Sequence, residues 1–462
     1  MNLIRSYNGF KPLSRSGLFR AFRVSSHSTK TQNSSPPKDD LYRRISPLGD
    51  PNISVSPVLD QWIKEGRIVS PTQLRSMIKE LRGYTRFTHA LEMSQWMSDR
   101  KYISLTPADM AIRLDLISKV HGVERAEKYF DTIPKQLRSF QTYGALLNCY
   151  AYSKSVDKAE ALVQKMKDLG LVIAPLTYNV LLNLYSQVGQ HEKIDALMEE
   201  MKERGIQMDR FTHSIRLSAY ATLSDTEGME RTIKRMEDDP QVTMDWNCYA
   251  IAADGYIKAG FIDKALDMLK RSEELITGKK TRVAYEFLIT LYASAGQKDE
   301  VYRIWNLYKS SEKLYNTAYT SMISSLSKLG DIEGAEKIVE EWETGGTSYD
   351  FRVPNCLIAA YCNNGLLEKA ESFLSKAIEK GRKPISSSWN RLAACYVKIN
   401  QMPKAVDAIR KAIEARRPGW KPSHETVSSC VEYLKQEGKV EAVEEFIQLL
   451  GESFGSSTTD DL

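Results

Sequence analysis

The residue types that most often bind metals or act as nucleophiles are present in this chain, but their spacing argues against both roles. The cysteines are scattered, without a CxxC pair and without a histidine at zinc-site spacing: Cys149, Cys248, Cys356, Cys362, Cys395 and Cys430. The histidines are equally dispersed, at His27, His89, His121, His191, His213 and His424. None lies in the HxE context that, with a downstream CxxC, forms a zinc-dependent deaminase site. We therefore predict no metal, and buried thiols of the kind found in a reducing compartment.

Other catalytic or cofactor-binding patterns are also weak. The stretch "TGKK" at Thr277 lacks the glycine spacing of a phosphate-binding loop. Carboxylates such as Glu199 and Glu200 fall on the polar face of a predicted helix, where they are more often solvated than catalytic. The sequence predicts a protein that is not an enzyme and that needs no cofactor.

The first 38 residues differ in composition from the rest of the chain. They contain seven lysines and arginines, no acidic residue and many serines. This composition is typical of an organelle transit peptide, and the dominance of arginine favours the mitochondrion, with the matrix as destination, over the plastid. A disordered basic tail is the alternative. Because the formal net charge of +5 includes these seven cations, the remaining chain carries about −2 and its overall charge gives no argument for nucleic acid.

The elements that position the remaining polar residues repeat along the chain. A small or aliphatic residue recurs every 33 to 38 residues, at Ala90, Ala126, Ala159, Ile194, Met229, Ala265, Val301, Ala335, Ala370, Ala405 and Val443. A second marker recurs every 34 to 36 residues, at Tyr150, Tyr185, Tyr220, Tyr256, Tyr292, Leu326, Tyr361 and Tyr396. Two markers with one period predict a solenoid.

Each repeat has the pattern of a helix, a turn and a second helix. In "YNVLLNLY" and "KIDALMEEM" the apolar residues fall at i, i+3, i+4 and i+7, and glycine marks the turn between them, as at Gly189. We predict an all-α, right-handed superhelical solenoid of about ten 35-residue repeats over residues 71–450, in which the aromatic and alanine stripes form the core. A linker with a partial capping helix precedes it over residues 39–70, and a disordered polar tail follows it over residues 451–462.

The repeats resemble those of the pentatricopeptide repeat family. The opening "TYN" and the closing segments "EEMKERGIQMD", "MKDLGLVIA" and "AIEKGRKPI" are similar to that family's pattern, and Leu182, Ile289 and Ile323 occupy a place where tetratricopeptide repeats have a small residue. The resemblance covers about four fifths of the chain. It implies a plant-type organellar protein of the plain 35-residue class, which binds single-stranded RNA with one base per repeat.

In that family, the residue after the opening aromatic contacts the base edge, helped by the last residue of the repeat. Carried over, the resemblance gives Asn179 with Asp209 as a uridine reader, and the pairs Ser214 with Asp245 and Thr320 with Asp350 as guanine readers. Asn355 and Asn390 occupy the same place and are further candidates, although the repeat of Asn355 closes on Ile385. The fit fails at Ala111, Gly144 and Ala250, and Glu286 is combined with Tyr315.

Lysine recurs late in the first helix of four repeats, at Lys119, Lys258, Lys328 and Lys398. The resemblance implies contacts to RNA phosphates at this place, and a row of lysines would follow a nucleic-acid backbone. A lysine near the end of a helix also compensates the helix dipole, and the sequence does not decide between the two roles.

Two functions remain open at this point. In the first, the chain binds an organellar transcript and acts in mitochondrial RNA stability, processing or translation. In the second, it is a structural subunit of the mitochondrial ribosome that binds ribosomal RNA and ribosomal proteins. No segment reaches the roughly 18 consecutive apolar residues of a membrane-spanning helix, so we expect no membrane partner.

Overall fold

The computed structural model describes residues 40–449, apart from residues 52, 101–102, 172–173, 278–280, 346–348, 417–419, 439–440, 442 and 447. All regular secondary structure in this part of the chain is helical. The predicted transit peptide and the predicted polar tail lie outside the described residues.

Ten helix hairpins follow one another within the described residues. Their first helices are α5 (Pro71–Gly83), α7 (Pro107–His121), α9 (Phe140–Tyr152), α11 (Pro175–Val188), α13 (Arg210–Leu223), α15 (Trp246–Lys258), α17 (Thr281–Ser294), α19 (Asn316–Lys328), α21 (Arg352–Asn363) and α23 (Ser386–Lys398). Their second helices are α6 (Phe87–Asp99), α8 (Val123–Thr132), α10 (Val156–Asp168), α12 (Glu192–Glu203), α14 (Thr226–Asp238), α16 (Ile262–Glu274), α18 (Lys298–Ser311), α20 (Ile332–Thr344), α22 (Leu367–Glu379) and α24 (Met402–Glu414). Two short helices precede them, α3 (Leu41–Ile45) and α4 (Ser56–Lys64); η2 (Lys135–Leu137) links α8 to α9, and α25 (His424–Gln436) follows α24.

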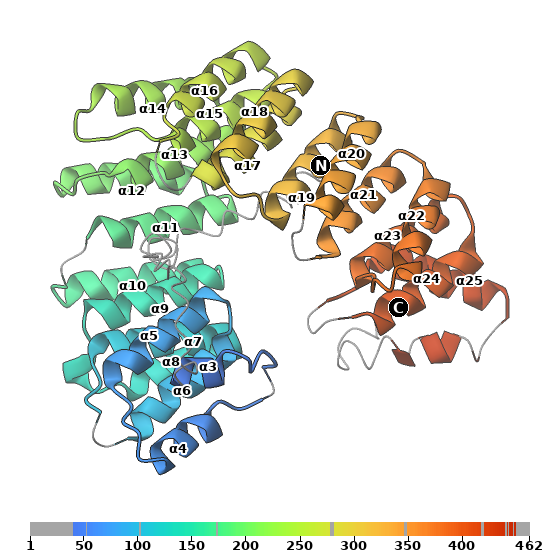
Figure 1. Cartoon of the computed structure of the whole chain (residues 1–462). Helices are drawn as coiled ribbons and strands as arrows, with labels where there is room; N and C mark the ends of the chain where they lie inside the picture. Colours follow the sequence, from blue (N-terminus) through green and yellow to red (C-terminus); the bar gives the residue numbers. More distant parts are fainter. Residues whose placement is uncertain are drawn as a thin grey trace, which may run out of the picture. The chain divides into compact units, whose positions relative to one another are not determined.

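The helices form two compact units. One contains the described residues up to Ala219 together with Thr232–Thr243, and the other contains Tyr220–Arg231 and the described residues from Met244 onward. In each unit, a first helix packs against its own second helix and against the first helix of the next hairpin, as α9 packs on α10 and α11. Figure 1 shows these stacked pairs, coloured along the sequence. The predicted all-α solenoid of helix hairpins is confirmed.

The repeating small residues of the second helices are buried. Ala126, Ala159, Ala265 and Ala335 have no exposed surface. A methyl group at this place lets the second helix approach the first closely, while larger side chains fill the space on either side. The recurring tyrosines are also buried, apart from the half-buried Tyr220; Tyr185 is 6% exposed and Tyr292 1% exposed. Both markers are therefore core residues.

The turns inside the hairpins need a left-handed backbone. Gly189 ends α11 with φ of +79°, and glycines occupy the same place in several other repeats. Lys154, Ser224 and Asn400 adopt φ near +57° at the equivalent place, although their Cβ atoms make this conformation costly.

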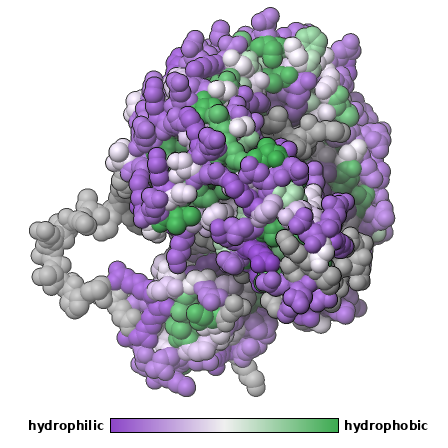
Figure 2. Space-filling view, turned by 90° about the vertical axis from the view of Figure 1, so that its right-hand side faces the viewer, coloured by the Kyte–Doolittle hydropathy of each residue, from purple (hydrophilic) through white to green (hydrophobic). Residues whose placement is uncertain are grey.

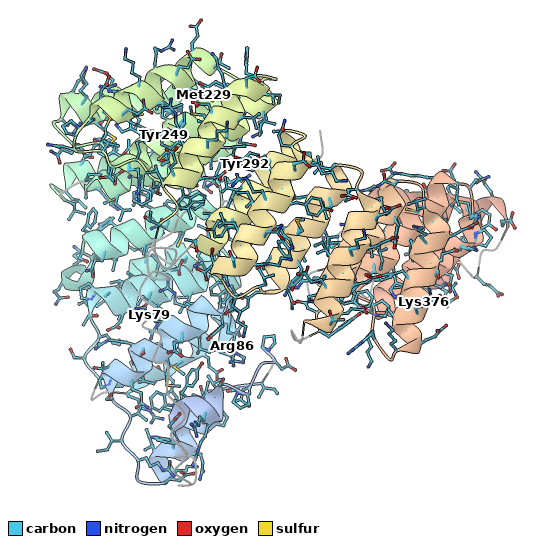
Figure 3. The ribbon with its side chains drawn as sticks, turned by 45° about the horizontal axis from the view of Figure 1, so that its top comes forward. Lys79, Arg86, Met229, Tyr249, Tyr292 and Lys376 are labelled. Carbon is cyan, nitrogen blue, oxygen red and sulfur yellow. The ribbon has the colours of Figure 1, made fainter. Side chains whose placement is uncertain are left out.

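The segment before the repeats is fixed by Arg86, which lies between α5 and α6 and is labelled in Figure 3. Its guanidinium donates hydrogen bonds to the backbone oxygens of Ser46, at 3.1 Å, and of Leu48. These oxygens lie just after α3, at a helix end where carbonyl groups have no partner within the helix. The first hairpin thus supplies the donor for the segment that covers it.

No helix in the described ranges is long and apolar enough to cross a membrane. The face visible in Figure 2 is mostly hydrophilic, with hydrophobic residues in small separate groups. This distribution is expected for amphipathic helices that bury one stripe between repeats.

Candidate nucleic-acid interface

The start of α11 carries a polar network that spans two repeats. The Asn179 Nδ2 donates to Asp209 Oδ1 at 3.1 Å, and the Thr212 hydroxyl donates to Asn179 Oδ1 at 2.8 Å. Thr212 also donates to Asp209, through its hydroxyl at 3.0 Å and its backbone nitrogen at 2.9 Å. Thr212 is fully buried, Asn179 is half-buried and Asp209 is exposed. The amide of Asn179 is therefore held in one orientation from both sides.

Asn355 and Asn390 occupy the corresponding places in α21 and α23. Asn355 Oδ1 accepts from the hydroxyl of Ser388 at 2.9 Å, and Asn390 Oδ1 accepts from the backbone nitrogen of Ser423 at 3.1 Å. In both cases the donor belongs to the following repeat, as Thr212 does for Asn179. The three asparagines thus share an anchored amide oxygen, which leaves Nδ2 as the donor that a ligand could use.

The hydroxyl groups of the other two predicted base readers are bonded to their own helices. The Ser214 and Thr320 hydroxyls donate to carbonyls of their own helices, Arg210 and Thr317, each at 2.8 Å. Asp245 caps α15 by accepting from Cys248 N at 3.2 Å. Ser214 belongs to the first compact unit and Asp245 to the second.

Asp350 is engaged by a neighbour in sequence rather than by Thr320. Its Oδ2 accepts from Arg352 Nε at 2.8 Å, and its Oδ1 accepts from Arg352 N at 3.0 Å. The Arg352 guanidinium holds the pKa of the Asp350 carboxyl below its usual value. Among the described residues, no hydrogen bond joins Thr320 to Asp350. This arrangement fixes the acid at the start of α21 and leaves the hydroxyl bound to its own helix.

Glu286 occupies the place of the anchored asparagines in α17. One of its oxygens accepts from the Thr317 hydroxyl at 2.8 Å and from the Tyr308 hydroxyl at 3.1 Å. Tyr315, which closes this repeat, is 49% exposed, and the Arg282 guanidinium lies 4.9 Å from the centre of its ring. The repeat of Glu286 therefore presents an acid and an aromatic ring flanked by a cation. At the same two places the repeat of Asn179 presents an amide and an acid.

The four lysines late in first helices differ in their surroundings. Lys119 Nζ lies 2.8 Å from Asp115 Oδ1, and Lys258 forms an ion pair with Asp254; both acids stand one turn earlier in the same helix. Lys328 Nζ donates to the Ser294 hydroxyl at 2.7 Å, and partial burial lowers its pKa. Lys398 is exposed at the end of α23. The ion pairs at Lys119 and Lys258 reduce the positive charge offered there.

The sequence reasoning missed a set of polar contacts between consecutive repeats, which we call the Tyr–Glu–Lys triads. In each triad a second-helix glutamate accepts a hydrogen bond from a lysine at the start of the next second helix and interacts with the hydroxyl of the recurring tyrosine of the next first helix. The triads are Glu127 with Tyr150 and Lys158, Glu160 with Tyr185 and Lys193, Glu230 with Tyr256 and Lys264, Glu336 with Tyr361 and Lys369, and Glu371 with Tyr396 and Lys404.

The triad of Glu160 illustrates the geometry. Its Oε1 lies 2.8 Å from the Tyr185 hydroxyl and 2.7 Å from Lys193 Nζ, and the same ammonium group lies 5.3 Å from the centre of the tyrosine ring. Burial acts to raise the pKa of Glu160, but the hydrogen bonds from Lys193 and Tyr185 outweigh it and the pKa is lowered. The carboxylate therefore stays charged and joins three helices. The signal in the sequence is a tyrosine that follows a glutamate by 23 to 26 residues and precedes a lysine by eight.

The junction at Leu326 lacks the recurring tyrosine and uses a different residue. The Tyr302 hydroxyl of α18 donates to Asp331 Oδ2 at 2.7 Å, and Lys298 Nζ lies 2.8 Å from the same oxygen. A Cβ atom at Gly334 would overlap with this tyrosine hydroxyl. The same three chemical groups are thus assembled from other positions, with a glycine making room for them.

Comparison with known proteins identifies the family of these repeats. The PPR repeat family pattern matches residues 175–222, and the PPR repeat pattern matches residues 141–171, 248–275, 317–346 and 353–382. The chain is 45% identical over 427 residues to the Arabidopsis thaliana pentatricopeptide repeat-containing protein At2g20710, mitochondrial, covering 92% of this chain and 87% of that one. It is 42% identical over 437 residues to the Arabidopsis thaliana large ribosomal subunit protein mL101 (rPPR4), covering 94% and 88%.

A solved structure shows the same fold. The crystal structure of the pentatricopeptide repeat protein PPR10 in complex with an 18-nt psaJ RNA element aligns with a TM-score of 0.52 at 20% identity, over 86% of this chain and 57% of that one. The identities to the Arabidopsis proteins extend over nearly the whole chain, and the matched repeats coincide with the helix hairpins. The chain belongs to the pentatricopeptide repeat family.

Proposed function

We propose that this protein binds single-stranded RNA in the mitochondrion through the starts of its first helices and acts in the stability, processing or translation of a transcript. The observation that carries the proposal is the network of Asn179, Asp209 and Thr212, which fixes an amide in one orientation at an accessible place. The remaining Nδ2 hydrogen of an anchored amide can donate to a base edge, and fixing the amide in advance lowers the entropic cost of binding. PPR10, which has the same fold, was solved with bound RNA.

The anchored asparagines define where bases would be contacted. Asn179 lies in the first compact unit, and Asn355 and Asn390 lie in consecutive repeats of the second. Because Asp209 accepts from one Nδ2 hydrogen of Asn179, that residue has fewer donors left than the other two asparagines and would select a base differently. The proposed readers Ser214 and Thr320 would have to exchange their bonds to helix carbonyls for bonds to RNA. Binding by this surface involves no catalytic step.

The test is an RNA-binding series with a matched pair of variants. Asn179→Ala removes an amide bonded to a carboxylate on the proposed RNA surface, whereas Gln164→Ala removes an amide bonded to Asp168, at 2.8 Å, on the exposed side of α10. We expect Asn179→Ala to weaken binding by about 1 kcal/mol, only for RNA with the preferred base in register, and Gln164→Ala to have no effect. Equal affinities for both variants against a selected and a scrambled RNA would reject the base-contact role.

The mitochondrial assignment rests on two observations. Several related proteins carry the word mitochondrial in their names, among them At2g20710 and At4g21705 from Arabidopsis thaliana. The first 38 residues of this chain are basic and free of acids. We expect a reporter fused to residues 1–38 to reach the mitochondrial matrix, and a cytosolic or plastid signal would contradict this.

A second function is favoured by one relative. The mL101 protein is named as a large ribosomal subunit protein, and its similarity extends over 94% of this chain. In this alternative the solenoid is a ribosomal subunit that contacts ribosomal RNA and neighbouring proteins. Co-sedimentation with mitochondrial ribosomes at high salt would support the alternative, whereas recovery with a single transcript in ribosome-free fractions would support the first function.

A further inference from the structure

Two cysteines lie side by side on neighbouring first helices of the second unit. Cys362 is on α21 and Cys395 is on α23, and these two helices pack against each other. Asn355 and Ser388, on the same two helices, are joined by a hydrogen bond of 2.9 Å. Each cysteine follows one of these residues by seven positions, or about two helical turns, and therefore lies on the same face. Each thiol is the largest influence on the pKa of the other, so the two groups lie close enough to interact.

The equivalent positions of another repeat junction show how closely two neighbouring first helices can approach each other. In α13 and α15 they are occupied by Ala221 and Gly255, and a Cβ atom on Gly255 would lie 2.8 Å from the Ala221 Cβ. A disulfide needs Cβ atoms about 3.5 to 4.5 Å apart. The stacking of first helices therefore places these two positions opposite each other.

The surroundings of the pair make the two thiols unequal. Arg391 stands one turn before Cys395 and Lys398 about one turn after it, both exposed on the same helix. The Cys362 thiol, Lys398 and Arg391 lower the pKa of Cys395, although partial burial opposes this. By contrast, burial raises the pKa of Cys149 to about 12 and that of Cys430 to about 11. Cys395 lies on the helix that carries both cations, which favours its thiolate as the attacking group.

We propose that Cys362 and Cys395 form a thiol–disulfide exchange site that reversibly links two consecutive repeats. The co-substrate is a small disulfide of the glutathione class. The Cys395 thiolate attacks one sulfur of the small disulfide, forms a mixed disulfide and releases one thiolate, which takes up a proton. Cys362 then loses its proton and attacks the Cys395 sulfur, which forms the internal disulfide and releases the second small thiol. Two protein thiols are oxidised and one small disulfide is reduced to two thiols.

The link has a defined structural effect. It joins α21 to α23 between the anchored Asn355 and the exposed Lys398, so it fixes the spacing of two repeats on their first-helix side. The bond itself does not depend on RNA binding. Its effect on RNA would rest on the proposed function and is measured separately below.

The test uses the full chain incubated with mixtures of oxidised and reduced glutathione. Free thiols are alkylated at each ratio, and the peptides are mapped by mass spectrometry under non-reducing conditions. We expect a Cys362–Cys395 disulfide that a thiol reductant reverses. Cys149 and Cys430 should stay reduced at every ratio and should therefore be recovered in alkylated form. In Cys362→Ser a stable mixed disulfide should accumulate on Cys395, because the resolving thiol is missing. In Cys395→Ser, Cys362 should remain unmodified at the same ratio.

Two controls separate this inference from a folding defect and from the RNA proposal. Cys356→Ser, which changes a half-buried thiol on the same helix, should leave disulfide formation unchanged, and all variants should keep the melting curve of the reduced parent protein. A mixed disulfide that persists on Cys395 in the parent protein, or random pairing among all six cysteines, would overturn the exchange site. RNA affinity is then compared between the reduced and the oxidised protein. If neither form binds RNA, the proposed function is wrong, but the disulfide exchange site is unaffected.

Discussion

Replacing Tyr185 by phenylalanine tests whether the Tyr–Glu–Lys triads stabilise the junctions between repeats. The substitution keeps the buried ring and removes one hydrogen bond, of 2.8 Å, to the Glu160 carboxylate. A hydrogen bond to a charged group contributes about 1.5 to 3 kcal/mol when it is shielded from water. The Glu160 side chain is 37% exposed and keeps its bond to Lys193, so water can replace part of the loss. We therefore expect a cost of about 1 kcal/mol.

Hydrogen exchange is the appropriate assay, because a solenoid shares its energy mainly between neighbouring repeats. A loss of about 1 kcal/mol should speed local exchange about fivefold in α10, α11 and α12 and leave distant repeats unchanged. Tyr152→Phe is the matched control, since this tyrosine is 71% exposed at the end of α9. An equal response to both substitutions, or faster exchange along the whole chain, would refute a local role for the triad.

The remaining predictions concern a turn, a packed glycine, the lysines and pH. Lys154→Gly should raise the free energy of unfolding by about 0.5 kcal/mol in denaturant titrations, because relief at φ +57° exceeds the entropy cost of glycine. Gly334→Ala should lower it by about 1 to 3 kcal/mol, because the new methyl group displaces the Tyr302 hydroxyl, and an unchanged midpoint would contradict that packing. If the lysines contact phosphates, changing Lys258, Lys328 and Lys398 to glutamate should weaken the binding of every RNA. The slope of log affinity against log salt concentration should fall by about 0.7 per lost contact. An unchanged slope would indicate that these lysines only compensate the helix dipole. Glu160 has a lowered pKa in the folded state, so its contribution is present above the ordinary glutamate pKa of 4.5 and is lost as pH falls through the folded value. Acid titration of Tyr185→Phe should therefore show the cost of the substitution shrinking in that range.

The helices and their packing were predictable from the sequence because they depend on periodic patterns. The alanine marker and the tyrosine marker each repeat in register, and both proved to be buried. Gly189 was predicted in the turn for the same reason, since a left-handed residue is needed there. The resemblance to the repeat family also brought Asn179 and Asp209 together correctly, as their hydrogen bond shows.

The remaining contacts of the candidate site depend on the offset between stacked helices, which a single repeat does not contain. Thr212 and Ser388 reach an asparagine of the preceding repeat, and this requires knowing which turn of one first helix lies beside which turn of the next. The triads draw on three helices and were missed for the same reason. Lys119 was predicted to contact an RNA phosphate or to compensate the helix dipole. Its ion pair with Asp115 was missed because it depends on side-chain rotamers that spacing alone does not fix.

The triads have a consequence for how chains of this type change in length. Glu160, Tyr185 and Lys193 belong to two repeats, and the same offsets recur at Glu336, Tyr361 and Lys369. A gene duplication that inserts one whole repeat would therefore supply a matching acceptor on one side and matching donors on the other. The new junction would be satisfied without any compensating substitution. Such a chain could gain or lose one anchored amide at a time, so the length of ligand it contacts could evolve independently of its stability.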